Sequence, residues 1–146
     1  MKIAMLAVLA GSVFGWAISP VFAASRADTA AIKVVRLKFE AFNRHDARTI
    51  EDIYANAASL HSPDYPDLTG SKQIADTYRK LFEAIPDAKD NLQTLESSAN
   101  HVYAQFVLTG HLKGAEDKPI SIRILSVYTV QDGRIVGDST YYDRKM

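Results

Sequence analysis

The sequence contains no cysteine, and this absence removes several kinds of chemistry at once. Without a thiol there is no thiolate nucleophile, no cysteine-ligated zinc site and no iron–sulfur cluster. Disulfide bonds are excluded as well, so the hydrophobic core alone must stabilise the folded chain.

The sequence also lacks an excess of charge of either sign, because it has 17 basic and 17 acidic side chains in 146 residues. A protein without net charge has no long-range field that would steer it toward nucleic acid or anionic lipid. We therefore expect no nucleic-acid partner, and no membrane partner for the mature chain.

Motifs for phosphate binding and for serine hydrolysis are missing too. The sequence has neither a glycine-rich phosphate loop nor a Gly-x-Ser-x-Gly motif. The four histidines form no pair at the spacing by which a helix binds zinc: His45, His61, His101 and His111. We therefore predict no metal site and no cofactor.

The N-terminal residues have the pattern of a secretory signal. Lys2 precedes an apolar run over residues 3–18, and Pro20 and the small residue Ala23 follow. This predicts a cleaved signal peptide over residues 1–23, a single domain over 24–146, and a periplasmic or secreted protein. A retained membrane anchor is the alternative, but a run of about 16 residues is short for a membrane span.

Three amphipathic helices are predicted in the first half of the mature chain. Apolar residues recur at spacings of three and four, which places them on one helix face: Ile32, Val35, Phe39 and Phe42. Asp46 is suited to cap a short second helix, and Ser71 is expected to cap a third helix that ends before Pro86. Between these two helices, residues 57–61 predict a brief strand and residues 63–67 a loop.

From about residue 92 onward the apolar period changes from 3.6 to 2, which is typical of strands. Alternating residues predict strands near 92–96, 102–109 and 120–128, and Asp132-Gly133 predicts a tight turn into a last strand that runs to about Asp143. Helices followed by an antiparallel sheet define an α+β domain, in which the helices cover the apolar face of the sheet. A sheet that curls around the helices would leave a pocket at its centre.

Several segments resemble the SnoaL-like branch of the nuclear transport factor 2-like superfamily. They are residues 42–46 (Phe-Asn-Arg-His-Asp), 54–63 (Tyr-Ala-Asn-Ala-Ala-Ser-Leu-His-Ser-Pro), 81–87 (Leu-Phe-Glu-Ala-Ile-Pro-Asp), the turn from Thr109-Gly110 to Gly114, and the closing hairpin from Asp132 to Asp143. The resemblance covers about residues 28–143. It implies a cone-shaped, curved antiparallel sheet wrapped around three N-terminal helices, often paired as a homodimer through the sheet.

The resemblance also implies site residues. Asp143 follows Tyr141-Tyr142 where SnoaL-like cyclases place an acid/base aspartate, and His61 lies where the family often has a histidine facing the cavity. Two departures from the cyclase pattern are Leu112 and Asp138, which stand where the family commonly has histidines.

The chemistry expected of these residues is proton transfer. A carboxylate in an apolar pocket has a raised pKa and exchanges protons near neutrality, and an imidazole polarises a carbonyl. The residues predicted to contact a substrate are Tyr54, Tyr78, Tyr141 and Phe82. A solvated Asp143, a His61 bonded to loop backbone, and tyrosines that serve as core aromatics are the structural alternatives.

Two functions that use the pocket are compatible with these expectations, and a purely structural dimer whose sheet face recruits a partner is a third. One is cofactor-free acid/base chemistry, of the isomerase, cyclase or dehydratase type, on a small apolar carbonyl compound. The other is a non-catalytic periplasmic ligand-binding or accessory protein that has the same apolar pocket.

Overall fold

The computed structural model describes residues 26–115 and 118–142, which fold into three helices and six strands. The predicted signal peptide and Asp143 lie outside these residues. The helices are α1 (Arg26–Asn43), α2 (Ala47–Ile53) and α3 (Ser71–Ala84). The strands are β1 (Tyr54–Ser62), β2 (Tyr65–Thr69), β3 (Lys89–Ser98), β4 (His101–His111), β5 (Pro119–Gln131) and β6 (Arg134–Tyr141).

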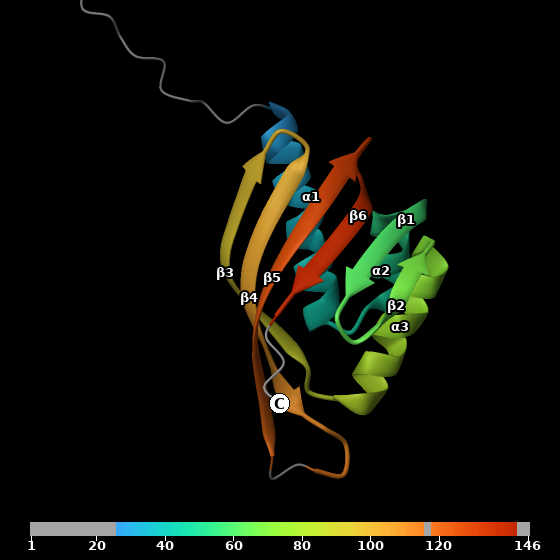
Figure 1. Cartoon of the computed structure of the whole chain (residues 1–146), viewed down its shortest axis with the longest axis vertical. Coiled ribbons are helices and arrows are strands. Elements are labelled where there is room, and N and C mark those ends of the chain that lie inside the picture. Colours follow the sequence, from blue (N-terminus) through green and yellow to red (C-terminus); the bar gives the residue numbers. More distant parts are fainter. Residues whose placement is uncertain (1–25, 116–117, 143–146) are drawn as a thin grey trace, which may run out of the picture.

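The strands form one open sheet in the order β2-β1-β6-β5-β4-β3 (Figure 1). Neighbouring strands are antiparallel except for β1 and β6, which run parallel. The antiparallel strands that the sequence predicted are β3 to β6, and the parallel pairing of β1 with β6 makes the complete sheet mixed. The parallel pair joins the first strand of the chain to the last.

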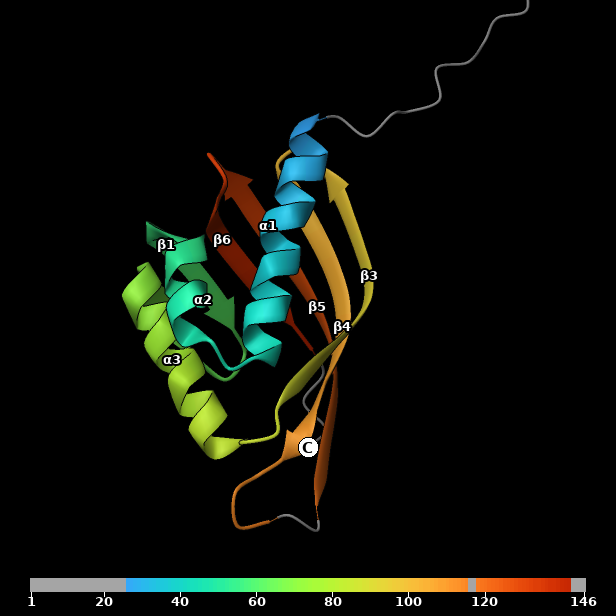
Figure 2. The ribbon, with the colours of Figure 1, turned by 180° about the vertical axis from the view of Figure 1, so that it is seen from behind.

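The helices all cover the same face of the curved sheet, as Figure 2 shows. There α1 lies along the side formed by β3, β4 and β5, while α2 and α3 lie beside β1. The core fills the space between these layers and includes Val35, Phe39, Ile74, Val102 and Tyr128. This arrangement confirms the predicted α+β class and the predicted amphipathic face of the first helix.

Local signals fix several of the element ends. Asp46 caps α2 by accepting a hydrogen bond from the backbone N–H of Thr49 at 3.0 Å, as predicted. Asp132 and Gly133 have φ values of 49° and 73°, so the turn between β5 and β6 has the backbone that the Asp-Gly pair predicts. The third helix ends at Ala84, two residues before Pro86.

Two local predictions were wrong. Residues Tyr65–Thr69 form the edge strand β2, although the sequence predicted a loop up to Asp67. An edge strand tolerates Pro66 because one side of it needs no hydrogen-bond partner. The N-cap of α3 is Gly70, with a φ of 95°, and Ser71 is the buried first residue of the helix.

Candidate functional site

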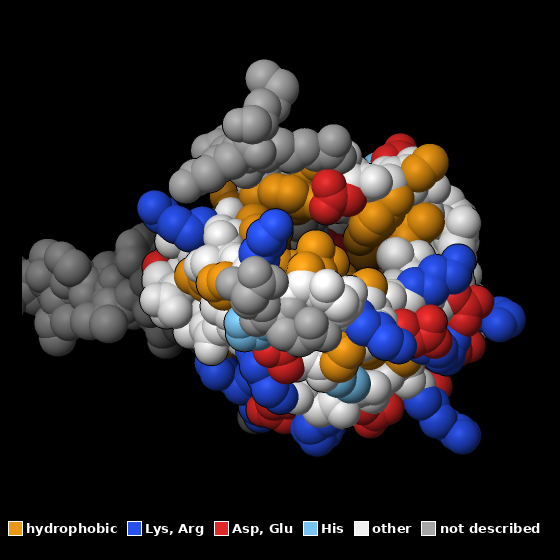
Figure 3. Space-filling model, turned by 90° about the horizontal axis from the view of Figure 1, so that it is seen from below, with side chains coloured by type: hydrophobic (Ala, Val, Ile, Leu, Met, Phe, Trp, Pro, Cys, Tyr) orange, Lys and Arg blue, Asp and Glu red, His pale blue; other side chains and the backbone are white. Residues whose placement is uncertain are grey.

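A cavity of about 90 Å³ lies between the sheet and the helices α1 and α3. Its walls are mainly apolar and come from α1, α3, β4 and β5: Phe42, Leu81, Phe106, Leu108, Ile122 and Ile124. Its rim contains Ser62, Asp64, Tyr65 and Tyr142. On the face seen in Figure 3, hydrophobic side chains and an acidic one surround a hollow.

One end of the cavity holds a buried ion pair. Nζ of Lys38 lies 3.4 Å from Oδ2 of Asp90, and the two side chains are only 2% and 3% exposed. Asn43 at the end of α1 fixes the backbone of Asp90, because its amide accepts from Asp90 N at 2.8 Å and donates to Asp90 O at 3.0 Å. Within the described part of the chain, Oδ1 of Asp90 has no hydrogen-bond partner.

Aromatic rings surround the ammonium group of Lys38. Nζ lies 4.5–5.8 Å from the centroids of five rings: Phe39, Phe42, Tyr78, Phe106 and Tyr128. The negative faces of such rings attract a cation. The lysine is therefore held as a charged group inside an apolar shell.

The pKa values of this pair follow from burial and from neighbouring charges. Burial alone would lower the pKa of Lys38, but the negative charges available at Tyr128, Asp90 and Asp138 outweigh it and raise that pKa. Burial raises the pKa of Asp90 and outweighs the opposing effect of Lys38. The amine is thus a permanent cation, and the carboxyl group beside it holds a proton more readily than an exposed aspartate does.

A second buried carboxyl group, Asp138 on β6, lies behind the cavity. The hydroxyl of Tyr54 donates to its Oδ2 at 2.6 Å, and that of Thr140 donates to Oδ1 at 3.3 Å. Asp138 is 1% exposed, and burial raises its pKa against the effects of Lys38 and of these two hydroxyl groups.

Hydroxyl groups connect the two carboxyl groups. Ser126 and Thr140 share a hydrogen bond of 2.8 Å, and the side chains of Tyr128 and Ser126 are hydrogen-bonded. Tyr128 in turn contacts Lys38 through a hydrogen bond. A continuous polar network therefore runs from Asp90 to Asp138 inside an otherwise apolar core.

Three of the residues predicted from the sequence lie at or next to this site. Tyr78 lines the cavity, and Tyr54 is fully buried against Asp138. Burial raises the pKa of both tyrosines well above the ordinary value. Phe82 does not line the cavity but stacks on His45, with ring centroids 4.4 Å apart, and packs edge-on against Phe42.

Two other predicted residues lie elsewhere. His61 is half exposed, and its Nδ1 pairs with Oδ1 of Asp67 on β2 at 2.7 Å. Tyr141 is 58% exposed on the sheet face turned away from the helices. Neither residue is part of the cavity wall.

Leu112 and Asp138, the two residues that depart from the cyclase pattern, lie in different surroundings: Leu112 at the surface and Asp138 in the interior. Leu112 is 48% exposed, and the neighbouring His111 pairs with Asp87 at 2.7 Å on the surface. Asp138 is the buried carboxyl group described above.

Sequence reasoning missed Lys38 and Asp90, although both had a recognisable signal. Lys38 is three residues after Val35 and four before Phe42, so it falls on the apolar face of its helix. Asp90 alternates with Ala88 and Leu92, which places it on the inner face of its strand. Each residue could have been identified as a charged side chain at a position where the amphipathic pattern predicts an apolar one.

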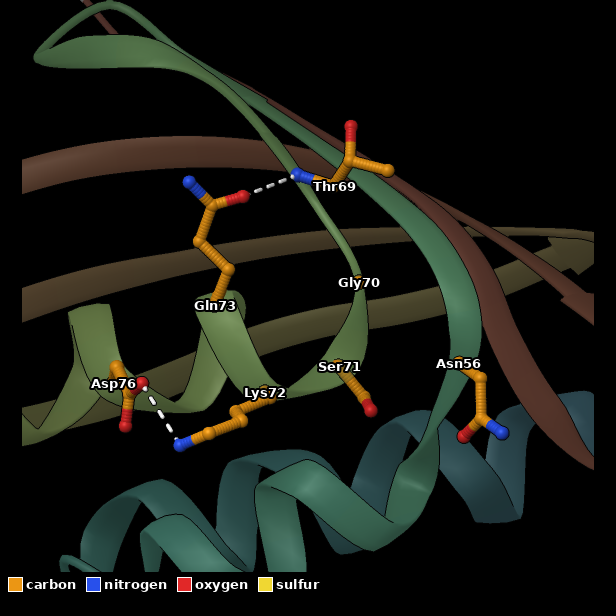
Figure 4. A pocket seen from close by; sticks show the side chains of 7 residues that line it. All are labelled: Asn56, Thr69, Gly70, Ser71, Lys72, Gln73 and Asp76. Carbon is orange, nitrogen blue, oxygen red and sulfur yellow. Dashed lines mark hydrogen bonds and ion pairs between the residues drawn. The ribbon is translucent and has the colours of Figure 1, made fainter.

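A second depression lies at the N-terminus of α3 and is drawn in Figure 4. Its polar groups are already engaged: Gln73 accepts from Thr69 N at 2.8 Å, and Lys72 pairs with Asp76 at 3.4 Å. Its side chains are largely exposed and are not connected to the buried network. This depression therefore offers no group with the burial that acid/base chemistry requires.

Two features are absent from residues 26–115 and 118–142. No group of three histidine, aspartate or glutamate side chains there is placed to hold a metal ion. None of the helices in this part of the chain is both long and apolar enough to cross a membrane.

Comparison with solved structures shows that the open curved sheet over three helices is the α+β fold of nuclear transport factor 2-like proteins. A protein from Jannaschia sp. CCS1 described as a SnoaL-like polyketide cyclase has a TM-score of 0.74 at 16% identity, covering 82% of this chain and 89% of its own. An LEH-like epoxide hydrolase from M. tuberculosis has a TM-score of 0.70 at 16% identity, covering 80% and 84%.

A protein of ketosteroid isomerase-like fold from Catenulispora acidiphila DSM 44928, solved with trimethylamine, has a TM-score of 0.71 at 19% identity, covering 76% and 85%. At these identities the likeness establishes the fold alone. No curated protein sequence matches the chain significantly. The SnoaL-like domain matches residues 35–137, and the chain therefore belongs to the SnoaL-like domain family.

Proposed function

We propose that this protein is an exported enzyme that transfers protons on a small, mostly apolar carbonyl compound without a cofactor. The observation that carries the proposal is the free Oδ1 of Asp90, a buried carboxyl oxygen in the cavity wall beside the Lys38 ammonium. A raised pKa suits Asp90 to remove a proton from a carbon atom and to return it.

Lys38 and Tyr128 have the complementary role. Both line the same end of the cavity as Asp90, and both can donate a hydrogen bond to a substrate oxygen. Negative charge that develops on this oxygen would be stabilised by the fixed positive charge of Lys38 in a site that excludes water. Because Lys38 stays protonated, it acts as a hydrogen-bond donor and not as a nucleophile.

The volume of the cavity limits the size of the substrate. An apolar cavity of about 150 Å³ is known to hold one benzene molecule. The cavity of about 90 Å³ in this protein is smaller. It would accept a carbonyl compound of a few carbon atoms without rearrangement.

The comparisons support this class of chemistry. Proteins that share the fold include one described as a SnoaL-like polyketide cyclase and one described as an epoxide hydrolase. Cofactor-free catalysis is therefore compatible with the fold, and the residues of the cavity supply the acid/base groups for it.

Ligand binding without turnover is the second candidate. It is favoured by the surface positions of His111 and Leu112, because the histidines of the cyclase pattern are then missing from the cavity. The same cavity would hold a small uncharged molecule, and the protein would act as a carrier or an accessory subunit.

Deuterium exchange distinguishes the two functions. Small neutral ketones and aldehydes are incubated with the protein in D₂O, and loss of the proton next to the carbonyl is followed by NMR. We expect exchange that Asp90→Asn slows by about 100-fold or more. Asp52→Asn, an exposed aspartate on α2, is the matched control and should exchange at the wild-type rate.

Exchange at the buffer rate throughout the panel would reject the enzymatic function, and equal rates for wild type and Asp90→Asn would reject the role of Asp90. Binding without exchange, seen as line broadening of the same ketones, would favour the carrier. Export is tested separately, by N-terminal sequencing of the mature protein from a bacterial host. We expect a start just after Ala23, and a mature chain that still begins at Met1 would reject export.

A further inference from the structure

Asp138 is a buried carboxyl group that the reaction proposed above does not use. Asp138 and Tyr54 do not themselves belong to the cavity wall, although Thr140, which donates to Oδ1 of Asp138, does. Asp138 is nevertheless held at full burial, with a hydrogen bond on each carboxyl oxygen. A buried ionisable group without a function would weaken the fold, since its desolvation is not matched by a cation in contact.

A short path of hydroxyl groups leads from Asp138 to the cavity. Tyr54 bonds to Asp138 at 2.6 Å, and the hydroxyl groups of Tyr54 and Tyr78 are in hydrogen-bond contact. Tyr78 itself lines the cavity. A hydroxyl group can accept one proton while it gives up another, so a chain of two tyrosines can carry a proton without ever becoming charged.

We propose that Asp138 is the proton store of this cavity, exchanging protons with a bound substrate through the hydroxyl groups of Tyr54 and Tyr78. This role rests on the proposed function, because it supplies the acid for the base Asp90. When Asp138 carries a proton, its carboxyl group donates to the oxygen of Tyr54, which reverses the hydrogen bond that Tyr54 donates to the ionised carboxylate. The proton of Asp138 then passes to Tyr54, that of Tyr54 to Tyr78, and that of Tyr78 to the substrate carbonyl. At the same time Asp90 removes a proton from the neighbouring carbon, and the substrate becomes an enol.

Charge balance supports this division of roles. Among the described residues, the buried part of the site contains one cation, Lys38, and two carboxyl groups, Asp90 and Asp138, so one added proton makes this part neutral. Lys38 contacts Asp90 directly and favours its ionised form, whereas Asp138 has only hydroxyl partners. When the proton leaves Asp138 and another arrives on Asp90, the total charge of the buried site does not change.

The two carboxyl groups are also coupled electrostatically. The negative charge of Asp138 raises the pKa of Asp90, so loss of the proton from one favours its uptake by the other. Titratable groups of several surrounding elements interact with Asp138 electrostatically or by hydrogen bonds. They are Lys38 of α1, Tyr54 and His61 of β1, Tyr65 of β2, Tyr78 of α3, Asp90 of β3 and Tyr128 of β5.

The relay is tested by removing the hydroxyl group between the store and the cavity. Tyr54→Phe keeps the ring in the core and interrupts the path, and Asp138→Asn removes the store. We expect each to slow deuterium exchange by about tenfold or more, and to abolish the dependence of the rate on pH that comes from Asp138. Tyr103→Phe, on the outer sheet face, is the control and should keep both the rate and the pH profile.

Infrared difference spectroscopy reads the proton on Asp138 without any substrate. We expect wild type to show the C=O band of a protonated carboxylic acid near neutral pH, to lose it in Asp138→Asn, and to show it shifted in Tyr54→Phe. If Asp138→Asn does not fold, Tyr54→Phe still tests whether the proton passes through the hydroxyl group of Tyr54, because this variant leaves the carboxyl group of Asp138 in place.

The outcomes separate the two proposals. Exchange that depends on Asp90 but is unchanged in Tyr54→Phe would overturn the relay through the two tyrosines and leave the proposed function intact, even if Asp138→Asn slows exchange, because Thr140 also connects Asp138 to the cavity. Absence of a protonated carboxyl band near neutral pH would overturn the proton store alone. Absence of exchange in wild type, with the band present, would overturn the proposed function and leave Asp138 as a protonated group of a binding site.

Discussion

Lys38 and Asp90 lie 52 positions apart in the chain, and their charged atoms are 3.4 Å apart in the folded protein. Their side chains are almost completely removed from water. Breaking such a pair leaves an isolated charge in an apolar interior, which is a much larger penalty than the loss of the contact itself.

Lys38→Met is expected to destabilise the protein by about 3–5 kcal/mol, because Asp90 and Asp138 are left without their cation. The double variant Lys38→Met with Asp90→Leu should recover a large part of this loss, since no unpaired charge then remains at Asp90. Free energies of unfolding in urea measure both effects. Lys72→Met, in the exposed pair with Asp76, should stay within about 0.5 kcal/mol of wild type, and a comparable loss there would contradict the explanation.

The pH dependence of stability should report on Asp138. Its folded pKa is raised above the ordinary value of 3.8, so the folded state keeps a proton that the unfolded chain releases. The stabilisation that this proton gives to the folded state is complete below the pKa that Asp138 has in the unfolded chain. It is lost as pH rises through the higher pKa that Asp138 has in the folded protein. Wild type should therefore lose stability relative to Asp138→Asn from about pH 4 upward, by at most about 1.4 kcal/mol per pH unit.

Comparing the two proteins at each pH removes the contribution of the carboxyl groups that do not interact with Asp138, whereas that of Asp90 changes with Asp138, because the two are coupled. Hydrogen bonds from Thr49 and His111 lower the pKa of Asp46 and of Asp87, which act in the opposite direction, but both residues are present in wild type and variant. The free energy of unfolding of wild type minus that of Asp138→Asn should fall as pH rises. If this difference stays constant or rises with pH, Asp138 is not protonated in the folded state.

Gly110 is a position where the fold has no room for a side chain. A Cβ atom there would lie 2.5 Å from Cγ2 of Ile85 and 3.3 Å from Cα of Ala88. We expect Gly110→Ala to cost about 1–3 kcal/mol, because the strand β4 must move away from the segment after α3. Gly137→Ala is the control, since its nearest contact would be 3.5 Å away, and thermal unfolding should show a much smaller change.

The outer face of the sheet is the expected dimer interface. Tyr103, Leu125 and Tyr141 are 38–58% exposed there, and Leu125 is the direct cross-strand neighbour of Tyr141. If this face pairs two copies, Leu125→Arg should convert the dimer to a monomer in analytical ultracentrifugation. Leu112→Arg, on the loop after β4, should leave the dimer intact, and a monomeric wild type would contradict the interface.

Local patterns in the sequence predicted much of the fold. The apolar face of α1, the cap at Asp46 and the turn at Asp132-Gly133 each depend on residues close in the chain, and the structure has all three. The strand β2 was missed because its pairing with β1, and not its own residues, makes it a strand.

The site was harder to predict because its contacts are long-range. Tyr54 and Tyr78 were identified as aromatic residues with a polar group, but their partner Asp138 is 84 positions from Tyr54. Lys38 and Asp90 looked like ordinary surface charges as long as each was considered without its helix or strand face. Only the folded arrangement brings one lysine and two aspartates to the same interior.

The parallel pairing of β1 with β6 has a consequence for how the protein reaches its folded form. A chain synthesised only as far as β5 contains the helices and the first hairpin, but β1 still lacks its central neighbour and Tyr54 lacks Asp138. Contacts between such distant residues form slowly, because a large loop must close before they stabilise anything. We therefore expect the network around Asp138 to be completed late in folding, so that the burial of Tyr54 after dilution from denaturant would report the closure of the sheet.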